Sequence, residues 1–513
     1  MSRQTAYQAL YRVTVAYLPF VVAAMIIAVA FHLKKQSDAE RPLKGFPLVG
    51  LEEEGLSPKE AWMKHGHRVM VKGLTEHKGA FQVMTGTGPK IMLPNRFTEE
   101  FRKNDMANLI QTQTRDNFAG WPGFDGMTFL SKHERVVVDA VRINLTQSMG
   151  AVTDSLVDET RLATPELFGQ DKEWQTIPIK SRIGSFVSRL SSRVFLGPKL
   201  CRDSEWLEIA QSHTVNLFQA SMAMREGPSL RRLLSFWFNP LYKRLRSQAH
   251  AARRILKPLI ETRKAEVRKA LAAGEKPEKV ADLIGWMVAQ AQASDIDYAA
   301  GQLGMSVVGI HTTTEALAEA LVDLCQHPSL FQPLREEIVR ELKDQGWTRT
   351  TLHRMRLMDS FLKESQRLHP ASAASVNRYL YADVKLSDGT VLPKGSRIWI
   401  AGRFDDPELY PEPDKLDAYR FLNLRSEAGK SNTWQHTSMT PEHLGFGYGD
   451  HGCPGRFFAS NELKIALSFL LLNYDWKLPD VPDNQTFIHF GVGNLLSPLC
   501  RLSYRRRSAE IEL

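Results

Sequence analysis

Cysteine is scarce in this chain: its 513 residues include four cysteines, and no two of them form a C-x-x-C pair. Such scarcity argues against a scaffold held by disulfides and favours a reducing compartment. A structural zinc site would need clustered ligands, whereas Cys201, Cys325, Cys453 and Cys500 are far apart in the sequence. We therefore expect neither a disulfide framework nor a zinc-stabilised fold.

The chain also lacks a strong charge of either sign. Its 66 basic and 57 acidic residues leave a formal charge of +9, and no basic stripe carries the aromatic residues that stack on nucleic-acid bases. We therefore expect no nucleic-acid partner. The modest excess suits an anionic membrane surface or an acidic protein partner. With 43% hydrophobic and 24% charged residues, the composition is that of an ordinary globular protein.

One long apolar run occurs, at 13–33, and it ends at Lys34 and Lys35. A bilayer core requires about 20 apolar residues in a helix, and lysines directly after the run favour a cytosolic body. We expect a lumenal tail at 1–12, a single transmembrane anchor at 13–33 and a turn-rich hinge at 34–50. The body would then lie on the cytosolic face of the endoplasmic reticulum. A cleaved signal peptide or a buried helix is the alternative.

The remaining residues, 51–513, alternate helical patterns with short extended runs. Length alone would permit several domains, but it is only a soft guide. Because this part contains neither internal repeats nor a second linker, we expect one large domain.

One loop isolates Cys453 between turn residues and a helix. Gly447, Gly449 and Gly452 allow backbone angles that other residues resist, so the loop can turn tightly. Pro454 suits the first turn of a helix, and the apolar sequence after it has helical periodicity. Cys453 would then lie at a helix N-terminus, where peptide dipoles and free N–H groups stabilise a thiolate.

The same three glycines spell G-x-G-x-x-G, the dinucleotide-binding fingerprint. That motif requires a buried strand before it, and the preceding sequence TPEHLG is a poor strand. A thiolate at a helix N-terminus can instead be the axial ligand of a haem iron. The loop has the pattern F-x-x-G-x-[R/H]-x-C-x-G. In all its fixed positions it resembles the haem-binding signature of the cytochrome P450 monooxygenases.

This resemblance assigns roles around the haem. Cys453 would be the axial ligand of the iron, Phe446 would pack near its sulfur, and His451 would meet a haem propionate. Arg378 follows the E-x-x-R helix as the family's propionate arginines do. Arg142 resembles the arginine of the W-x-x-x-R motif, although the tryptophan is missing here. Arginine suits a propionate because two N–H donors of its planar guanidinium can bind both oxygens of a carboxylate.

The segment 297–325 predicts one long helix, whose 29 residues would span about 43 Å. Glycine and a run of threonines in its middle are poor helix formers. They resemble the family's oxygen-activation motif, [A/G]-G-x-[D/E]-T-[T/S]. By this resemblance Thr312 would hydrogen-bond the oxygen and order the waters that deliver protons. His311 stands where an acid is usual, and it either relays protons near neutral pH or pairs with a buried polar group.

Glu364 and Arg367 are three residues apart on a predicted helix, so both can face one partner. Glu364 stands 89 residues before the cysteine, and the pair resembles the family's buried E-x-x-R motif. That motif pairs with an arginine in a later P-x-R-F-like motif, for which Arg420 is the candidate, with Ala418 in place of the proline. The role would be architectural. Because removing one partner of a buried pair costs several kcal/mol, loss of Glu364 should block folding or haem uptake.

The resemblance covers nearly the whole chain and implies a mainly α fold with small β-sheets. It also implies haem b, O₂ as co-substrate and electrons from NADPH through a separate reductase. The residues of these motifs are most similar to those of fungal secondary-metabolism members of the family, including gibberellin-type diterpenoid oxidases. This favours hydroxylation of an apolar terpenoid or polyketide-derived substrate. The alternatives are oxidative rearrangement, ring expansion or desaturation at the same haem, or a haem-binding protein without turnover.

Overall fold

The computed structural model describes residues 41–226, 239–278, 280–481 and 484–513, with isolated positions between 17 and 30. In this part the fold is mainly α with small sheets, as the sequence predicted. The transmembrane anchor predicted at 13–33 lies almost entirely outside the described residues. Among the helices that are described, none has the length and apolar character needed to cross a bilayer.

Helices occur along the whole described chain. The α-helices are α2 (Pro58–Glu76), α3 (Leu109–Asp116), α4 (Asp125–Lys132), α5 (Glu134–Asp139), α6 (Met149–Phe168), α7 (Ile179–Leu200), α8 (Ser204–Glu226), α10 (Pro240–Ala272), α11 (Leu283–Gln290), α12 (Tyr298–Gln326), α13 (Phe331–Gln345), α14 (Arg349–Arg354), α15 (Arg356–Leu368), α16 (Arg420–Ser426) and α17 (Arg456–Asn473). Shorter 3-10 or π segments are η1 (Glu52–Glu54), η2 (Asn95–Phe101), η3 (Ala140–Leu145), η4 (Pro328–Leu330) and η5 (Gly449–His451).

The strands are short and are spread over the chain between the helices. They are β1 (Phe81–Thr85), β2 (Gly88–Leu93), β3 (Ala107–Asn108), β4 (Gln175–Pro178), β5 (Ala374–Leu380), β6 (Val384–Lys385), β7 (Val391–Leu392), β8 (Arg397–Ala401), β9 (Tyr474–Lys477), β10 (Phe487–Phe490), β11 (Gly493–Leu496) and β12 (Arg501–Arg506).

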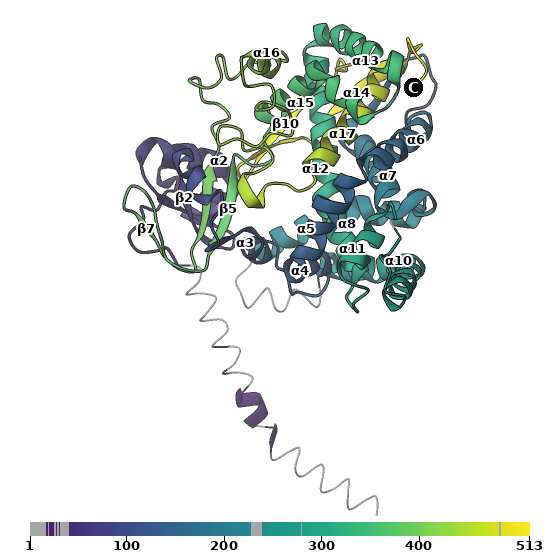
Figure 1. Cartoon of the computed structure of the whole chain (residues 1–513). Helices are drawn as coiled ribbons and strands as arrows, with labels where there is room; N and C mark the ends of the chain where they lie inside the picture. The colour runs from purple at the N-terminus through teal and green to yellow at the C-terminus, as the bar shows by residue number, and fades with distance from the viewer. Residues whose placement is uncertain are drawn as a thin grey trace, which may run out of the picture.

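Helix α12 crosses the centre of the helical part (Figure 1). Its first turn is capped by Asp297, whose Oδ1 accepts a hydrogen bond from the N–H of Ala300 at 3.1 Å. Such a cap satisfies one of the free N–H groups of a helix end. Helices α4, α7, α8, α10 and α17 pack around α12. Its bounds, Tyr298–Gln326, agree with the predicted helix to within one residue at each end.

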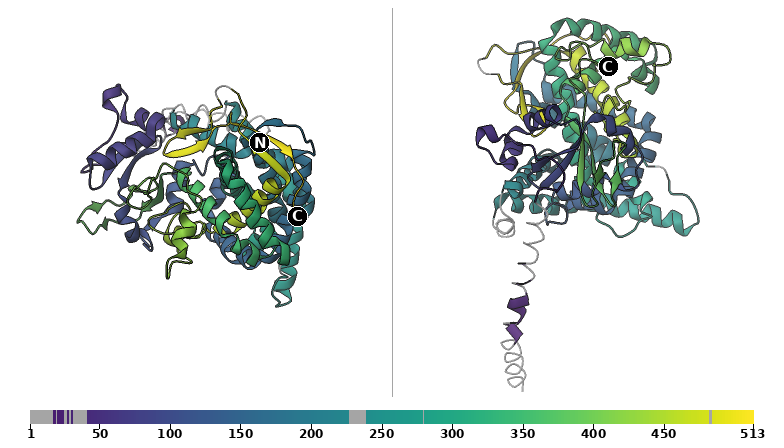
Figure 2. Two further views of the ribbon diagram at one scale, coloured as in Figure 1. Left: turned by 90° about the horizontal axis from the view of Figure 1, so that it is seen from above. Right: turned by 90° about the vertical axis from the view of Figure 1, so that its left-hand side faces the viewer.

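The largest sheet lies beside α2, at the left of Figure 1 and facing the viewer in the right-hand view of Figure 2. Its strand order is β1-β2-β8-β5-β3, with β2 and β8 parallel and the other neighbours antiparallel. Ile91 and Leu93 of β2 belong to one hydrophobic cluster and Met92 to another. Successive side chains of a strand point to opposite faces, so both faces of this sheet are covered.

A larger hydrophobic cluster fills the helical part and joins residues from Phe129 to Tyr504. Helices α7, α12 and α17 all contribute buried side chains to it. The loop at 444–455, which contains Cys453 and is called the cysteine loop below, lies between the sheet and this core. Its Tyr448 belongs to a hydrophobic cluster of the sheet, and Phe458, just after the loop, belongs to the helical cluster.

Candidate functional site

The loop before α17 is closed by its own backbone. The N–H of Cys453 donates to the carbonyl oxygen of Phe446 at 2.8 Å, and the N–H of Gly447 donates to that of Leu444 at 2.9 Å. Gly449 has a left-handed φ of +68°, and a Cβ there would collide with the carbonyl of Arg102. Only glycine fits this position, because it combines positive φ with a close backbone approach.

Cys453 lies just outside α17. The helix begins at Arg456 with Gly455 as its N-cap, so the prediction that Pro454 belongs to the first turn was wrong. Burial raises the pKa of the Cys453 thiol, while the N–H groups of Gly455 and Arg456 and the charge of Arg456 lower it. A cation at the sulfur would shift this balance towards the thiolate, since an opposite charge favours the ionised form.

Arg456 is a functional candidate that the sequence reasoning missed. Its Nη1 donates to the carbonyl oxygen of Cys453 at 2.9 Å, and the sulfur and the guanidinium interact electrostatically. The available signal was the C-x-x-R spacing, because residues three apart are neighbours on a helical turn.

The ring of Phe446 packs beside the buried imidazole of His436, with 5.2 Å between ring centroids. His436 in turn hydrogen-bonds the hydroxyl of Ser460 on α17 at 3.0 Å. Phe446 therefore connects the start of the cysteine loop to the helix that follows it.

A second group of predicted residues lies on α12, which packs against α17. Val308 is 44% exposed and Thr312 is also exposed, whereas their neighbours Val307 and Thr313 are buried. Residues four apart share one face of a helix. Val308 and Thr312 therefore lie on a face of α12 that the neighbouring elements leave uncovered.

The two predicted residues of the oxygen-activation motif point to different surroundings. Thr312 Oγ1 donates to the carbonyl oxygen of Val308 at 2.9 Å, on the exposed face. His311 is partly buried and hydrogen-bonds the main-chain carbonyl of Gln211, while its Nε2 is buried without a partner in the described part of the chain. Burial lowers the pKa of His311 to about 4, so its imidazole is neutral at pH 7.

The predicted cations gather around the cysteine loop although they come from distant segments. Arg378 of β5 donates to the carbonyl oxygen of Tyr448 at 3.3 Å, and Arg142 of η3 donates to that of Asp450 at 3.1 Å. Burial lowers the pKa of His451, and repulsion from Arg378 and Arg142 lowers it further. The structure thus brings Arg378, Arg142 and His451 together.

The surroundings of Arg378 show whether Arg378, Arg142 and His451 fit an anionic cofactor. The Arg378 side chain is 2% exposed, and burial lowers the pKa of its guanidinium to about 10. Its Nε has no hydrogen-bond partner, and no carboxylate pairs with it among the residues described. A buried charge without a counter-charge is costly. The site therefore fits a group that brings carboxylates, as the haem propionates do.

Glu364, Arg367 and Arg420 meet in one buried network. Arg367 forms a bidentate pair with Glu364, with both N···O distances 2.9 Å, and Arg420 Nε donates to Glu364 Oε1 at 3.0 Å. The remaining guanidinium donors go to the main-chain carbonyls of Phe404, Pro411 and Pro413 and, at 3.4 Å, Lys415. The network therefore holds the main chain of the segment between α15 and α16 in place.

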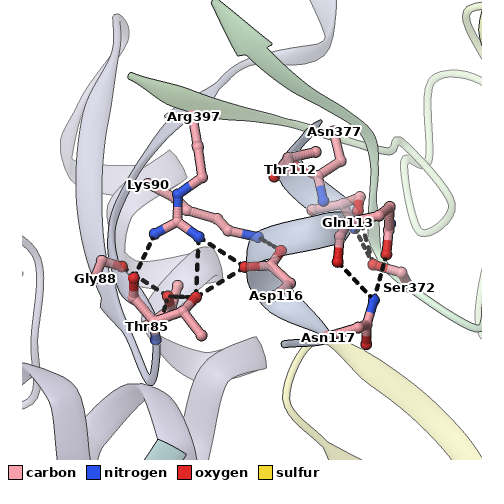
Figure 3. Close-up of polar contacts among 12 residues, drawn as sticks. Thr85, Gly88, Lys90, Thr112, Gln113, Asp116, Asn117, Ser372, Asn377 and Arg397 are labelled. Carbon is pink, nitrogen blue, oxygen red and sulfur yellow. Dashed lines mark hydrogen bonds and ion pairs between the residues drawn. The ribbon is translucent and has the colours of Figure 1, made fainter. Parts of the chain in front are cut away.

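A cavity of about 270 Å³ adjoins the cysteine loop. Its walls are Leu444, Gly445 and Gly447 of the loop, polar residues of β5 and Gln113 of α3. Figure 3 shows Gln113 hydrogen-bonded to Asn117, and Asn377 close to Thr112. Because Pro370, Ala371 and Trp399 also line it, the space beside the loop is bordered by both neutral polar and apolar side chains.

Comparisons with known proteins agree with this site. A family model described as "Cytochrome P450" matches residues 130–499. "Cytochrome P450 monooxygenase bsc2" of Alternaria brassicicola is 39% identical over 494 residues, covering 95% of this chain and 94% of the relative. "Cytochrome P450 monooygenase 1" of Gibberella fujikuroi is 38% identical over 436 residues, 84% of this chain and 99% of the relative.

"Dihydromonacolin L monooxygenase mokC" of Monascus pilosus is 36% identical over 422 residues, 82% of this chain and 80% of the relative. The chain belongs to the cytochrome P450 family, and the resemblance inferred from its motifs is confirmed. It is a P450 monooxygenase, an oxidoreductase of a family that uses haem iron and O₂.

Proposed function

We propose that the chain is a membrane-anchored monooxygenase that oxidises an apolar secondary metabolite, terpenoid or polyketide-derived, in a fungal biosynthetic pathway. The proposal rests on three features that occur together in this structure. They are the closed loop of Cys453, the buried Arg378 without a carboxylate partner among the described residues, and the exposed face of α12 that carries Thr312. Each feature suits a different part of one bound haem.

The cofactor would be held by residues already described. Cys453 would bind the iron through its sulfur, while Arg378, His451 and Arg142 would hold the propionates. When bound, the haem supplies the redox chemistry that activates O₂ and transfers one oxygen atom to the substrate. The network of Glu364, Arg367 and Arg420 would fix the backbone that supports the loop.

Thr312 and His311 would divide the handling of protons. The Thr312 hydroxyl, on the exposed face of α12, can hold a water or a proton at Oγ1. His311 is neutral at pH 7 because burial lowers its pKa to about 4. It would act as a neutral hydrogen-bonding group that bridges α12 and the Gln211 carbonyl on α8, and it would pass a proton on without storing one.

Electrons would come from NADPH through a separate reductase that docks on the side of Cys453. The catalytic body would lie on the cytosolic face of the endoplasmic reticulum, held by the apolar segment at 13–33. An apolar substrate is supported by Val308, whose exposed side chain lines the same face as Thr312. It is supported as well by the relative whose name gives dihydromonacolin L as its substrate.

Replacement of Cys453 by serine tests the proposal most directly. The wild-type protein, reduced and bound to CO, should show the long-wavelength Soret band of a thiolate-ligated haem, and Cys453→Ser should abolish it. Cys201→Ser is the matched control, because this buried thiol already contacts polar oxygens of Glu159 and Pro198. A band that persists in Cys453→Ser would exclude the ligand assignment. Reductase-dependent NADPH consumption with an oxygenated product would exclude a haem-binding protein without turnover.

A further inference from the structure

A second cavity, of about 190 Å³, lies away from the cysteine loop at the edge of the large sheet. It is bordered by Arg41, Arg115, Lys394 and Arg397, together with Leu43, Pro89, Gly395 and Ser396. All four ionisable residues of this lining are cationic. The space far exceeds the roughly 10–15 Å³ that one enclosed water molecule requires, so a small anionic group can enter.

Arg397, which lines the cavity, belongs to a buried cluster with more cationic than anionic side chains. Lys90 and Arg397 are 1% and 2% exposed, and both pair with the same carboxylate, that of Asp116, with Arg397 Nη1 2.7 Å from its Oδ1 (Figure 3). Arg225 adds a third cation by donating to the main-chain carbonyl of Asp116 at 2.7 Å. One carboxylate therefore faces three buried or partly buried cations.

The crowding has an electrostatic consequence. Burial lowers the pKa of Lys90 to about 7; the charge of Asp116 opposes this shift, and repulsion from Arg397 and Arg225 adds to it. Burial lowers the pKa of Arg397 to about 10, with Arg115 among the repelling charges. The carboxylate of Asp383 lies close by, but it accepts a hydrogen bond from the main-chain N–H of Lys394 at 2.7 Å.

We propose that this cavity, the Arg41–Arg397 pocket, binds a phosphate-class anion, and that in the cell this anion is the headgroup of an acidic phospholipid. The exposed Arg41 and Lys394 and the half-buried Arg115 would contact the phosphate. Arg397 would add long-range attraction while it keeps its pair with Asp116. Phosphate pairs well with guanidinium groups because their geometries match.

The lipid source rests on the membrane anchor of the proposed function. Arg41 stands eight residues after the end of the apolar run at 13–33. Eight residues span at most about 28 Å when fully extended, so an anchored chain keeps this pocket near the bilayer surface. Basic residues close to an anionic leaflet gain attraction from its negative potential.

The test uses the full-length holoprotein in a neutral detergent and measures binding by calorimetry. The probes are dioctanoyl phosphatidic acid, dioctanoyl phosphatidylcholine and inorganic phosphate. Phosphatidic acid should bind at one saturable site, at least tenfold more tightly than either of the other two probes. Lys394→Glu should weaken that binding at least tenfold, since this side chain is exposed and, among the described residues, only its main-chain N–H is hydrogen-bonded. Lys269→Glu, an exposed charge reversal at the end of α10, should leave it unchanged.

The other outcomes each decide a separate point. Equal binding of inorganic phosphate and phosphatidic acid, both weakened by Lys394→Glu, would show a free-anion site and overturn the lipid source. Binding that Lys394→Glu does not change would overturn the pocket itself. The CO spectrum of the same samples reports the haem site independently, so failure of the pocket and failure of the proposed oxygenase are distinguishable.

Discussion

Glu364 and Arg420 are 56 residues apart in the chain, yet Arg420 Nε donates to Glu364 Oε1 at 3.0 Å in the core. The Glu364 carboxylate is fully buried and also pairs with Arg367. One anion thus compensates two buried guanidinium groups, and both of these in turn hold main-chain carbonyls of the segment before α16.

Glu364→Gln should therefore prevent stable folding. The neutral amide leaves two buried cations without a counter-charge, for which a loss of about 3–5 kcal/mol is expected. Soluble yield and the thermal unfolding midpoint measure the effect. The exposed pair of Glu427 and Lys430 offers the control, because Glu427→Gln removes a surface pair that contributes little. Equal unfolding midpoints for Glu364→Gln and wild type would contradict the architectural role.

Arg378→Met should weaken haem retention more than it weakens the fold. The side chain is buried, and no carboxylate in the described chain neutralises it; in the proposed function a haem propionate supplies its counter-charge. The rate of haem transfer to a scavenging globin should rise at least tenfold. Arg378→Lys should give an intermediate rate, because lysine keeps the positive charge but lacks the paired N–H donors of the guanidinium. If Arg378→Met loses haem no faster than wild type, Arg378 does not bind the propionates.

Thr312→Ala should leave haem bound but divert reducing equivalents to peroxide. The alanine removes the hydroxyl on the exposed face of α12 while preserving the helix, since alanine is a strong helix former. Peroxide formed per NADPH consumed is the measurement, with Thr312→Ser as the matched variant that keeps the hydroxyl. Unchanged coupling in Thr312→Ala would count against this residue as the group that holds the proton.

Glu462 of α17 should make stability depend on pH. It is fully buried, its Oε1 accepts a hydrogen bond from Ser191 at 2.7 Å, and its Oε2 has no partner in the described chain. Burial raises its pKa from 4.5 to about 8. The folded state then holds the proton to higher pH than the unfolded chain does. The folded state therefore loses about 1.4 kcal/mol of relative stability per pH unit between these two values.

Glu462→Gln should remove this loss, because the amide is already neutral. The unfolding midpoint of the variant, relative to wild type, should rise steadily from pH 5 to pH 8. Glu278→Gln changes an exposed carboxylate and serves as the control. A midpoint difference that stays constant over this pH range would show that Glu462 is ionised in the folded protein.

Several features could be predicted from the sequence because they are local. The tight loop around Cys453 follows from closely spaced glycines, and α12 agrees with the helix predicted at 297–325 to within one residue at each end. The prediction for the start of α17 was wrong by two residues, since Pro454 suits a first turn but the helix begins only at Arg456. Helix ends depend on caps that a proline alone does not fix.

The environment of each side chain could not be predicted in this way. His311 and Thr312 are adjacent, and sequence reasoning left the role of His311 open between proton relay and buried pairing. In the folded protein a turn of 100° per residue directs His311 towards the Gln211 carbonyl and leaves Thr312 exposed. The packing of α8 against α12 decides this difference.

By itself the sequence determined the P450 family, the iron-binding candidate Cys453 and the residue types available for each role, because short-range spacing encodes turns and helices. Only the tertiary structure decided which distant charges meet. It joined Arg420 to Glu364, placed no carboxylate of the described residues at Arg378, and paired both Lys90 and Arg397 with Asp116. Pairing, burial and the resulting pKa values arise from distances through space, which the order of residues does not state.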